Sequence, residues 1–163
     1  MPDVRVAILG VGNVLEADDG AGVWAVRDLE AAGLPEGARA YDMGTALLDL
    51  PSELDGCERL VVVDAVRSGG TPGAVWRVEF DALEEAEAEP VSLHQVGARR
   101  MLAMARLSGL RLGPAALVAV EAAEIRLHEG LSGPVRRAMP RLLAAVRDEV
   151  EAALARAPEE VVA

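Results

Sequence analysis

Val4-Arg5-Val6-Ala7-Ile8-Leu9-Gly10-Val11-Gly12 decides the fold, because this mostly apolar run ends in two glycines and a helical pattern follows it. Residues 4–9 have the length and composition of a buried strand, and residues 20–32 carry apolar side chains at helical spacing. We therefore predict a strand, a glycine turn and a helix. Such a unit opens many α/β folds, in which functional side chains gather beyond the carboxyl ends of the strands.

The rest of the chain alternates between the same two kinds of pattern. Further strands are expected at 38–43, 60–63, 74–80 and 115–120, and helices at 47–54, 92–107 and 134–155. The helix at 47–54 is short and interrupted near Pro51, and the strand at 74–80 has the alternation of a sheet edge. Because helical crossovers join parallel strands, we expect one three-layer α/β domain over residues 1–163, with a mostly parallel sheet of about five strands. The tail after about residue 156 is expected to fray.

Composition restricts the class of protein. With 163 residues and 52% hydrophobic content, the chain can bury a core without disulfides, and its single cysteine, Cys57, is expected to be a reduced structural thiol. A net charge of -11 disfavours binding to nucleic acid or to an anionic membrane. No apolar run reaches the roughly 18 residues of a membrane span, and no leader pattern is present. We expect a cytoplasmic protein, a monomer or weak oligomer, whose partners are proteins or cations.

Three polar segments follow predicted strand ends or open predicted helices, and they form the candidate site. Asp19 lies near the start of the first helix, Asp64 ends the apolar strand 60–63, and His94 lies in the first turn of the helix expected at 92–107. Because such positions meet at one edge of an open α/β sheet, we expect these side chains to converge. Two carboxylates and one imidazole suit a divalent metal and leave part of its shell open. The set fits metal-assisted hydrolysis or recognition of a metal carried by a partner, and spacing alone does not separate the two.

The same residues also have structural interpretations. Asp18 and Asp19 suit a helix start, where carboxylates stabilise exposed backbone amides, and one can cap while its neighbour points into the crevice. Ser92 forms a capping box with Gln95 three residues later, which explains the serine without a nucleophilic role. Asp64 is harder to explain structurally, because a carboxylate at the end of an apolar strand needs hydrogen bonds, a cation or water.

Other candidates are weaker. Asp42 ends the second strand and either serves as an acid or base at the same sheet edge or closes a turn. His128 is expected in a surface loop. Gly10-Val11-Gly12 lacks the third small residue of a dinucleotide-binding turn, because Leu15 occupies that position. The chain contains no lysine, which excludes Schiff-base catalysis, a P-loop and a Ser-Lys dyad.

The chain resembles the hydrogenase maturation endopeptidases, which remove a C-terminal extension from the large subunit of nickel-iron hydrogenases after nickel insertion. The resemblance covers most of the chain and rests on five segments: Gly10-Val11-Gly12-Asn13-Val14-Leu15, Asp18-Asp19-Gly20-Ala21-Gly22, Asp42-Met43-Gly44-Thr45, Val62-Val63-Asp64-Ala65 and Ser92-Leu93-His94-Gln95-Val96-Gly97. Two segments depart from the pattern of the family. Met43 replaces the first glycine of the usual Asp-Gly-Gly-Thr segment, and residues 119–122 replace a usual Gly-x-x-Pro turn. These departures bear on partner specificity more than on fold.

The resemblance implies that Asp19, Asp64 and His94 bind nickel that belongs to the hydrogenase large-subunit precursor, with no organic cofactor. The attacking water is then activated by the metal or by a carboxylate, with Asp42, Asp19 and Asp64 as the catalytic candidates. Two other functions are compatible with the residues. One is a metal-sensing or chaperone-like module that binds a metalloprotein precursor without cutting it, and the other is a small hydrolase or nucleotide-binding protein.

Overall fold

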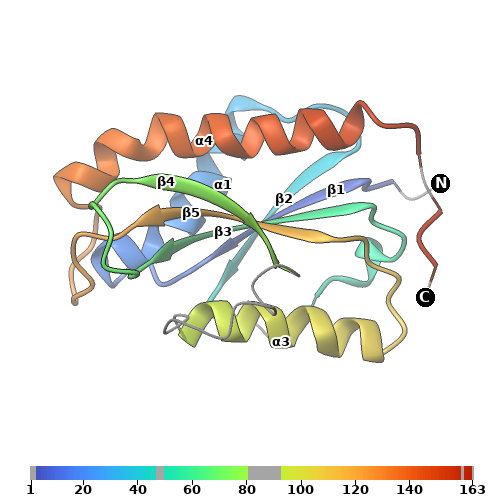
Figure 1. Ribbon diagram of the computed structural model, residues 1–163, viewed down its shortest axis with the longest axis horizontal. Helices are drawn as coiled ribbons and strands as arrows, with labels where there is room; N and C mark the ends of the chain where they lie inside the picture. Colours follow the sequence, from blue (N-terminus) through green and yellow to red (C-terminus); the bar gives the residue numbers. More distant parts are fainter. Residues whose placement is uncertain (1–2, 47–49, 81–92, 159, 163) are drawn as a thin grey trace.

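The fold is known from a computed structural model, which describes residues 3–46, 50–80, 93–158 and 160–162, with the backbone only at 93–97 (Figure 1). Five strands form one sheet in the order β2-β1-β3-β5-β4. Four strands run parallel, and β4 pairs antiparallel with β5 at the edge. The strands are β1 (Val6–Val11), β2 (Ala38–Gly44), β3 (Arg59–Val66), β4 (Val75–Glu79) and β5 (Ala115–Glu121). The expected mostly parallel sheet is confirmed.

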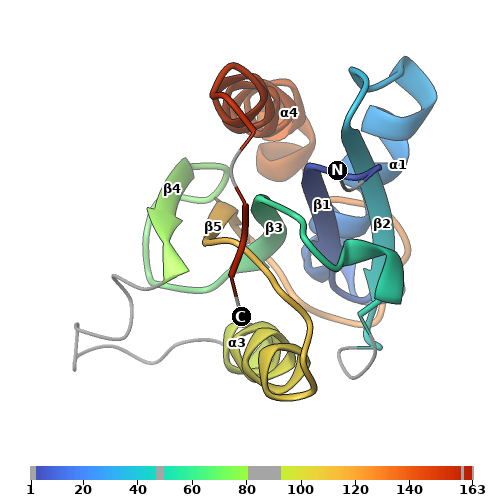
Figure 2. The same ribbon diagram turned by 90° about the vertical axis from the view of Figure 1, so that its right-hand side faces the viewer.

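Helices cover both faces of the sheet and complete the three layers. Figure 2 shows α1 and α4 on one face and α3 on the other. The helices are α1 (Ala21–Ala32), α3 (Leu93–Leu107) and α4 (Gly133–Leu154), with short 3-10 turns η1 (Ala17–Gly20) and η2 (Ser52–Leu54). None of the described helices is long and apolar enough to cross a membrane.

The core has one apolar layer on each face of the sheet. Side chains alternate along a strand, so Val61 and Val63 pack towards α1 and α4, whereas Leu60 and Val62 pack towards α3. The central strands β3 and β5 are buried along their whole length. This explains why both strands are continuous apolar runs in the sequence.

Some expected boundaries were wrong. Asp64 lies inside β3, two residues before its end, because pairing with β5 continues to Val66. Over 50–54 the expected helix is a single 3-10 turn beginning after Pro51, since proline does not fit inside a helix. Residues 47–49 and 81–92, including the proposed Ser92 cap, lie outside the described part of the chain.

Two close backbone contacts bring the start of α1 against the sheet. Gly12 has φ +134°, and a Cβ there would lie 1.8 Å from the carbonyl oxygen of Asp19. A Cβ on Gly22 would lie 2.1 Å from the carbonyl oxygen of Val63. Glycine is therefore required at both positions. In a dinucleotide-binding turn, the third small residue lets the helix approach the strand closely. Leu15 occupies that position here, and Gly22 allows the close approach instead.

Asp18 holds η1 to the loop between β5 and α4. Its side chain is completely buried. Oδ2 accepts hydrogen bonds from the amides of Ala123 (2.9 Å) and Glu124 (3.0 Å) and from Ser132 Oγ (2.8 Å). Oδ1 accepts the Ser132 amide at 2.8 Å. The aspartate that the sequence suggests as a local helix cap therefore binds a loop more than 100 residues away.

An ion-pair network closes the opposite end of the sheet. Arg59, the first residue of β3, is 6% exposed and donates to both carboxylate oxygens of Glu79 at 2.6 and 3.0 Å. It also donates to Glu149 of α4 at 3.0 Å, and Arg77 bridges the two glutamates. Hydrogen bonds from Arg59 lower the pKa of Glu79. Burial alone raises the pKa of Glu149, but bonds from Arg77 and Arg59 outweigh it and lower that pKa.

Replacing Asp18 tests whether its carboxylate is structural. In Asp18→Asn, an NH2 group faces backbone amides that need an acceptor, so we expect the free energy of unfolding to fall by about 2–3 kcal/mol. Urea denaturation measures this change. Asp28→Asn, an exposed aspartate of α1, is the control and should change stability by less than about 0.5 kcal/mol. Equal stability of the two variants would contradict the role of Asp18.

The network predicts acid sensitivity. Because both glutamates have folded pKa values below their unfolded values, their contribution is present above about pH 4.5 and disappears as pH falls through the folded values. We expect Glu149→Gln to flatten the decline in unfolding free energy below that pH, measured by denaturation at several pH values. Glu151→Gln, an exposed neighbour on α4, should keep the wild-type profile. A wild-type profile for Glu149→Gln would argue against the network.

Candidate functional site

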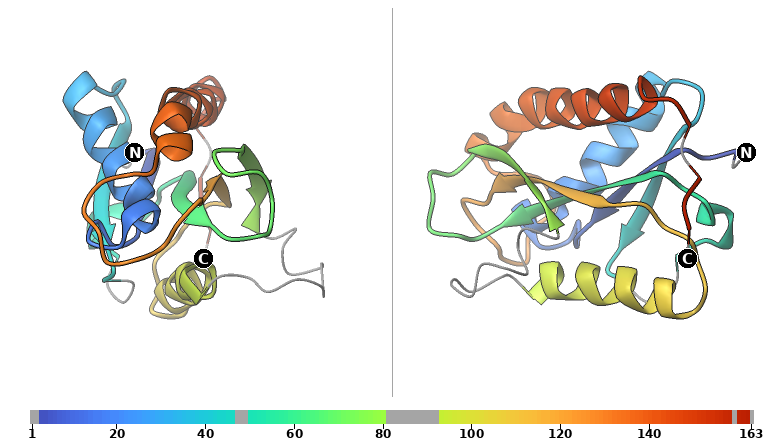
Figure 3. Two further views of the ribbon diagram at one scale, coloured as in Figure 1. Left: turned by 90° about the vertical axis from the view of Figure 1, so that its left-hand side faces the viewer. Right: turned by 45° about the vertical axis from the view of Figure 1, so that its right-hand side comes forward.

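The carboxyl edge of the parallel strands is where the candidate residues gather. Figure 3 (left) views this edge, where η1 and the start of α1 meet the ends of the strands. The first turn of α3 lies at the same end of the molecule (Figure 1). The fold therefore brings the elements that carry Asp19, Asp64 and His94 to one edge.

Asp19 and Asp64 are both buried carboxylates at this edge. Asp19 is 3% exposed, and its Oδ2 accepts the Asn13 amide at 2.8 Å. Its element, η1, packs against β3. Asp64 is 1% exposed and lies on the α3 face of β3, since Val62 and Val66 on the same side belong to the core under α3. Burying two carboxylates is costly, so each needs hydrogen bonds or a cation near its oxygens.

His94 lies in the first turn of α3, and α3 covers the face of the sheet on which Asp64 lies. Its side chain is outside the described residues. Among the described side chains, which do not include His94, no group of three His, Cys, Asp or Glu is placed to hold a metal ion. Completion of the three-ligand set by His94 therefore stays a prediction.

Asp42 lies at the same edge but on the other face. Its Oδ2 accepts Arg27 Nε at 3.0 Å and pairs with Arg27 Nη2 at 2.8 Å, and its Oδ1 accepts the Gly44 amide at 3.1 Å. Because Arg27 belongs to α1, Asp42 faces α1 whereas Asp64 faces α3. The strands β2 and β3 are also separated by β1, so the two backbones are about 10 Å apart.

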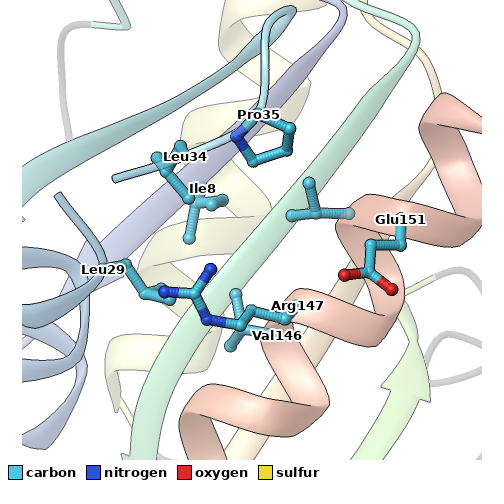
Figure 4. Close-up of a pocket in the computed structure, with 8 residues that line it drawn as sticks. Ile8, Leu29, Leu34, Pro35, Val146, Arg147 and Glu151 are labelled. Atoms are coloured by element: carbon cyan, nitrogen blue, oxygen red, sulfur yellow. The ribbon is translucent and has the colours of Figure 1, made fainter. Parts of the chain in front are cut away.

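A pocket of about 150 Å³ opens beside Asp42. We call it the Arg27–Asp42 pocket, and it is lined by Gly12, Asn13, Val14, Val23, Arg27, Asp42, Gly44 and Thr45. The cavity in Figure 4 is different in place and chemistry. It has about 10 Å³, enough for roughly one water, and lies between the C-terminal parts of α1 and α4 among mainly apolar side chains.

The sequence interpretation missed two charged residues at this edge. Glu121 is 2% exposed and accepts hydrogen bonds from Ser68 N (2.8 Å), Ser68 Oγ (2.7 Å) and Gly70 N (3.2 Å), so it fixes the loop after β3. A carboxylate at the end of an apolar strand was the same signal that singled out Asp64. Arg27 had no comparable signal, because an arginine on an exposed helix face is ordinary.

His128 and Cys57 both lie where the sequence predicts no catalytic role for them. His128 is exposed in the loop before α4, as expected, and its backbone pairs with Leu15 and Ala17. Cys57 is a buried free thiol. Burial raises its pKa to about 11, so its thiolate is scarce at neutral pH and it is a poor nucleophile.

Comparison with known proteins agrees with this architecture. A family model described as hydrogenase maturation protease (HycI) matches residues 23–156. The hydrogenase expression/formation protein HupD of Rhodobacter capsulatus is 35% identical over 159 residues, 96% of this chain and 71% of that protein. The hydrogenase 2 maturation protease of Escherichia coli is 30% identical over 151 residues, 89% of this chain and 92% of that protein.

Solved structures show the same fold. The hydrogenase maturating endopeptidase HybD from E. coli superposes with a TM-score of 0.75 at 27% identity, covering 91% of this chain and 93% of that chain. The [NiFe] hydrogenase maturation protease HybD from Thermococcus kodakarensis has a TM-score of 0.75 at 31% identity, covering 90% and 99%. By its fold and its sequence matches, the chain belongs to the hydrogenase maturation protease family.

Proposed function

We propose that this protein is a nickel-dependent endopeptidase that removes the C-terminal extension of a nickel-iron hydrogenase large-subunit precursor. It acts in the cytoplasm as a monomer or weak oligomer and recognises inserted nickel through Asp19, Asp64 and His94. The observation that carries the proposal is the pair of buried carboxylates, Asp19 and Asp64, at the sheet edge where the helix bearing His94 begins. Family membership supplies the reaction class.

The donor set suits nickel that is already part of the substrate. Imidazole and carboxylate are acceptable ligands for a borderline divalent metal. Three such ligands leave positions for groups of the precursor that hold the metal already. The contact therefore forms only when the precursor carries its metal, which makes nickel a checkpoint for cleavage.

Hydrolysis of the peptide bond needs a base for the attacking water. We place this base on the α3 face of the sheet. Asp19 and Asp64 line the edge where the metal-bearing end of the precursor docks, so one of them, or the metal, activates the water. Asp42 is a less suitable base for a bond held there. It faces α1, and both of its oxygens already accept hydrogen bonds.

Intact-mass measurement of the precursor tests the reaction. The candidate large-subunit precursor is prepared with and without nickel and incubated with the protein. We expect loss of a C-terminal peptide only from the nickel-loaded form. Complex formation without any change in mass would instead favour the non-cutting metal-sensing module, and equal cleavage of both forms would contradict the nickel checkpoint.

Paired substitutions test the ligands. We expect Asp19→Asn, Asp64→Asn and His94→Ala each to slow cleavage of the nickel-loaded precursor at least about a hundredfold. Substitution of residues that only support metal ligands already lowers metal affinity or activity roughly 10- to 100-fold. Asp28→Asn and His128→Ala are controls of the same residue types on exposed surfaces and should retain activity. Circular dichroism checks that each variant is folded. Full activity in a folded Asp64→Asn variant would exclude that residue from the site.

A further inference from the structure

The Arg27–Asp42 pocket is separate from the proposed nickel contact. It lies at the same edge of the sheet but on the α1 face, between the ends of β1 and β2 and the first turns of α1. Its volume of about 150 Å³ equals that of an engineered cavity that holds benzene, so one side chain or chain end fits. Neither Asp19 nor Asp64 lines it.

Arg27 lines this pocket with its side chain 47% exposed, and part of its hydrogen-bonding capacity is unused. Its guanidinium stacks over the Trp24 ring with 5.1 Å between Cζ and the ring centroid. Asp42 binds it side-on through Nε and Nη2. A guanidinium carries five N–H donors, and no described residue accepts from Nη1 or from the second hydrogen of Nη2. The free end of the guanidinium is a fork that matches a carboxylate.

The other polar groups of the pocket strengthen this preference for an acceptor. Asn13 Oδ1 accepts the Leu15 amide at 3.0 Å, which leaves its NH2 group as a donor that no described residue uses. Both Asp42 oxygens are engaged, by Arg27 and by the Gly44 amide. The unused groups that the described residues contribute are therefore N–H donors, beside an Arg27–Asp42 ion pair whose charges offset each other.

We propose that the Arg27–Asp42 pocket binds a carboxylate of the precursor's C-terminal extension, from an acidic side chain or from the chain terminus. Arg27 and Asn13 hold this carboxylate, and the extension then crosses the end of β1 towards Asp64. The assignment to the precursor rests on the proposed function, whereas the preference for a carboxylate rests only on the geometry of the pocket. Arg27 thereby becomes a determinant of substrate specificity.

Binding of small carboxylates tests the chemistry without any precursor. NMR signals of Arg27 Nε–H and the Asn13 NH2 group are followed while N-acetyl-glutamate α-amide, N-acetylglycine or N-acetyl-glutamine α-amide is added. The first probe carries a side-chain carboxylate, the second a terminal carboxylate, and the third only amides. We expect saturable shifts with at least one carboxylate and none with the third probe. Equal shifts with all three probes would overturn the proposal.

Substitution of Arg27 tests the residue. Arg27→Met should weaken carboxylate binding at least about tenfold, as measured on the Asn13 NH2 signal, because it removes a charge-assisted pair of hydrogen bonds. Arg27→Lys keeps the charge but not the fork and should bind with intermediate affinity. Arg39→Met is the matched control. Arg39 lies on β2, pairs with Glu53 of η2 and does not line the pocket, so this variant should bind like wild type. Undiminished binding by Arg27→Met would overturn the assignment.

Cleavage then tests the link to the precursor. Carboxylates of the extension are neutralised one at a time in the nickel-loaded precursor, including the terminal one by amidation. We expect one change to raise KM for wild type and not for Arg27→Met, with kcat nearly constant. If no neutralised carboxylate raises KM in this way although nickel-dependent cleavage proceeds, the pocket proposal is wrong and the proposed function stands. If the probes bind but no precursor is cut, the proposed function fails and the carboxylate site stands.

Discussion

The buried carboxylate of Asp18 is the interaction on which the arrangement of the site depends. It joins η1 to a loop 105–114 residues later, and four donors converge on its two oxygens. Because Asp19 is the next residue and its carbonyl oxygen lies against Gly12, this anchoring fixes Asp19 relative to the end of β1. A structural aspartate and a candidate metal ligand thus stand side by side, and the rigidity of the first positions the second.

Alternation along the strands separates the charges of this edge into two regions. Asp64 faces α3, where His94 begins its helix, whereas Asp42 faces α1 and pairs with Arg27. In the two proposals, a substrate chain crossing the edge meets the proposed metal contact on one face and the proposed carboxylate pocket on the other. Together the two proposals set two independent requirements for one substrate, the presence of nickel and the chemistry of the extension.

Local patterns in the sequence were sufficient to predict most of the fold. Apolar runs gave β1, β3 and β5, helical spacing gave α1 and α4, and the parallel topology placed Asp19, Asp64 and the start of α3 at one edge. Features that depend on tertiary contacts were not predictable in this way. The partners of Asp18 lie in a distant loop, the ion pair of Arg27 depends on how α1 packs on β2, and the position of Asp64 inside β3 depends on pairing with β5.

Paramagnetic nickel offers the most direct test of the central claim, that this edge contacts the metal through its α3 face. Ni²⁺ alone is titrated into the isotopically labelled protein, and the broadening of each backbone amide is recorded. The account predicts that broadening is strongest around Asp19, Asp64 and His94, that it is lost in Asp64→Asn, and that it is weak around Arg27. Strongest broadening around His128, or broadening that persists in a folded Asp64→Asn variant, would contradict it.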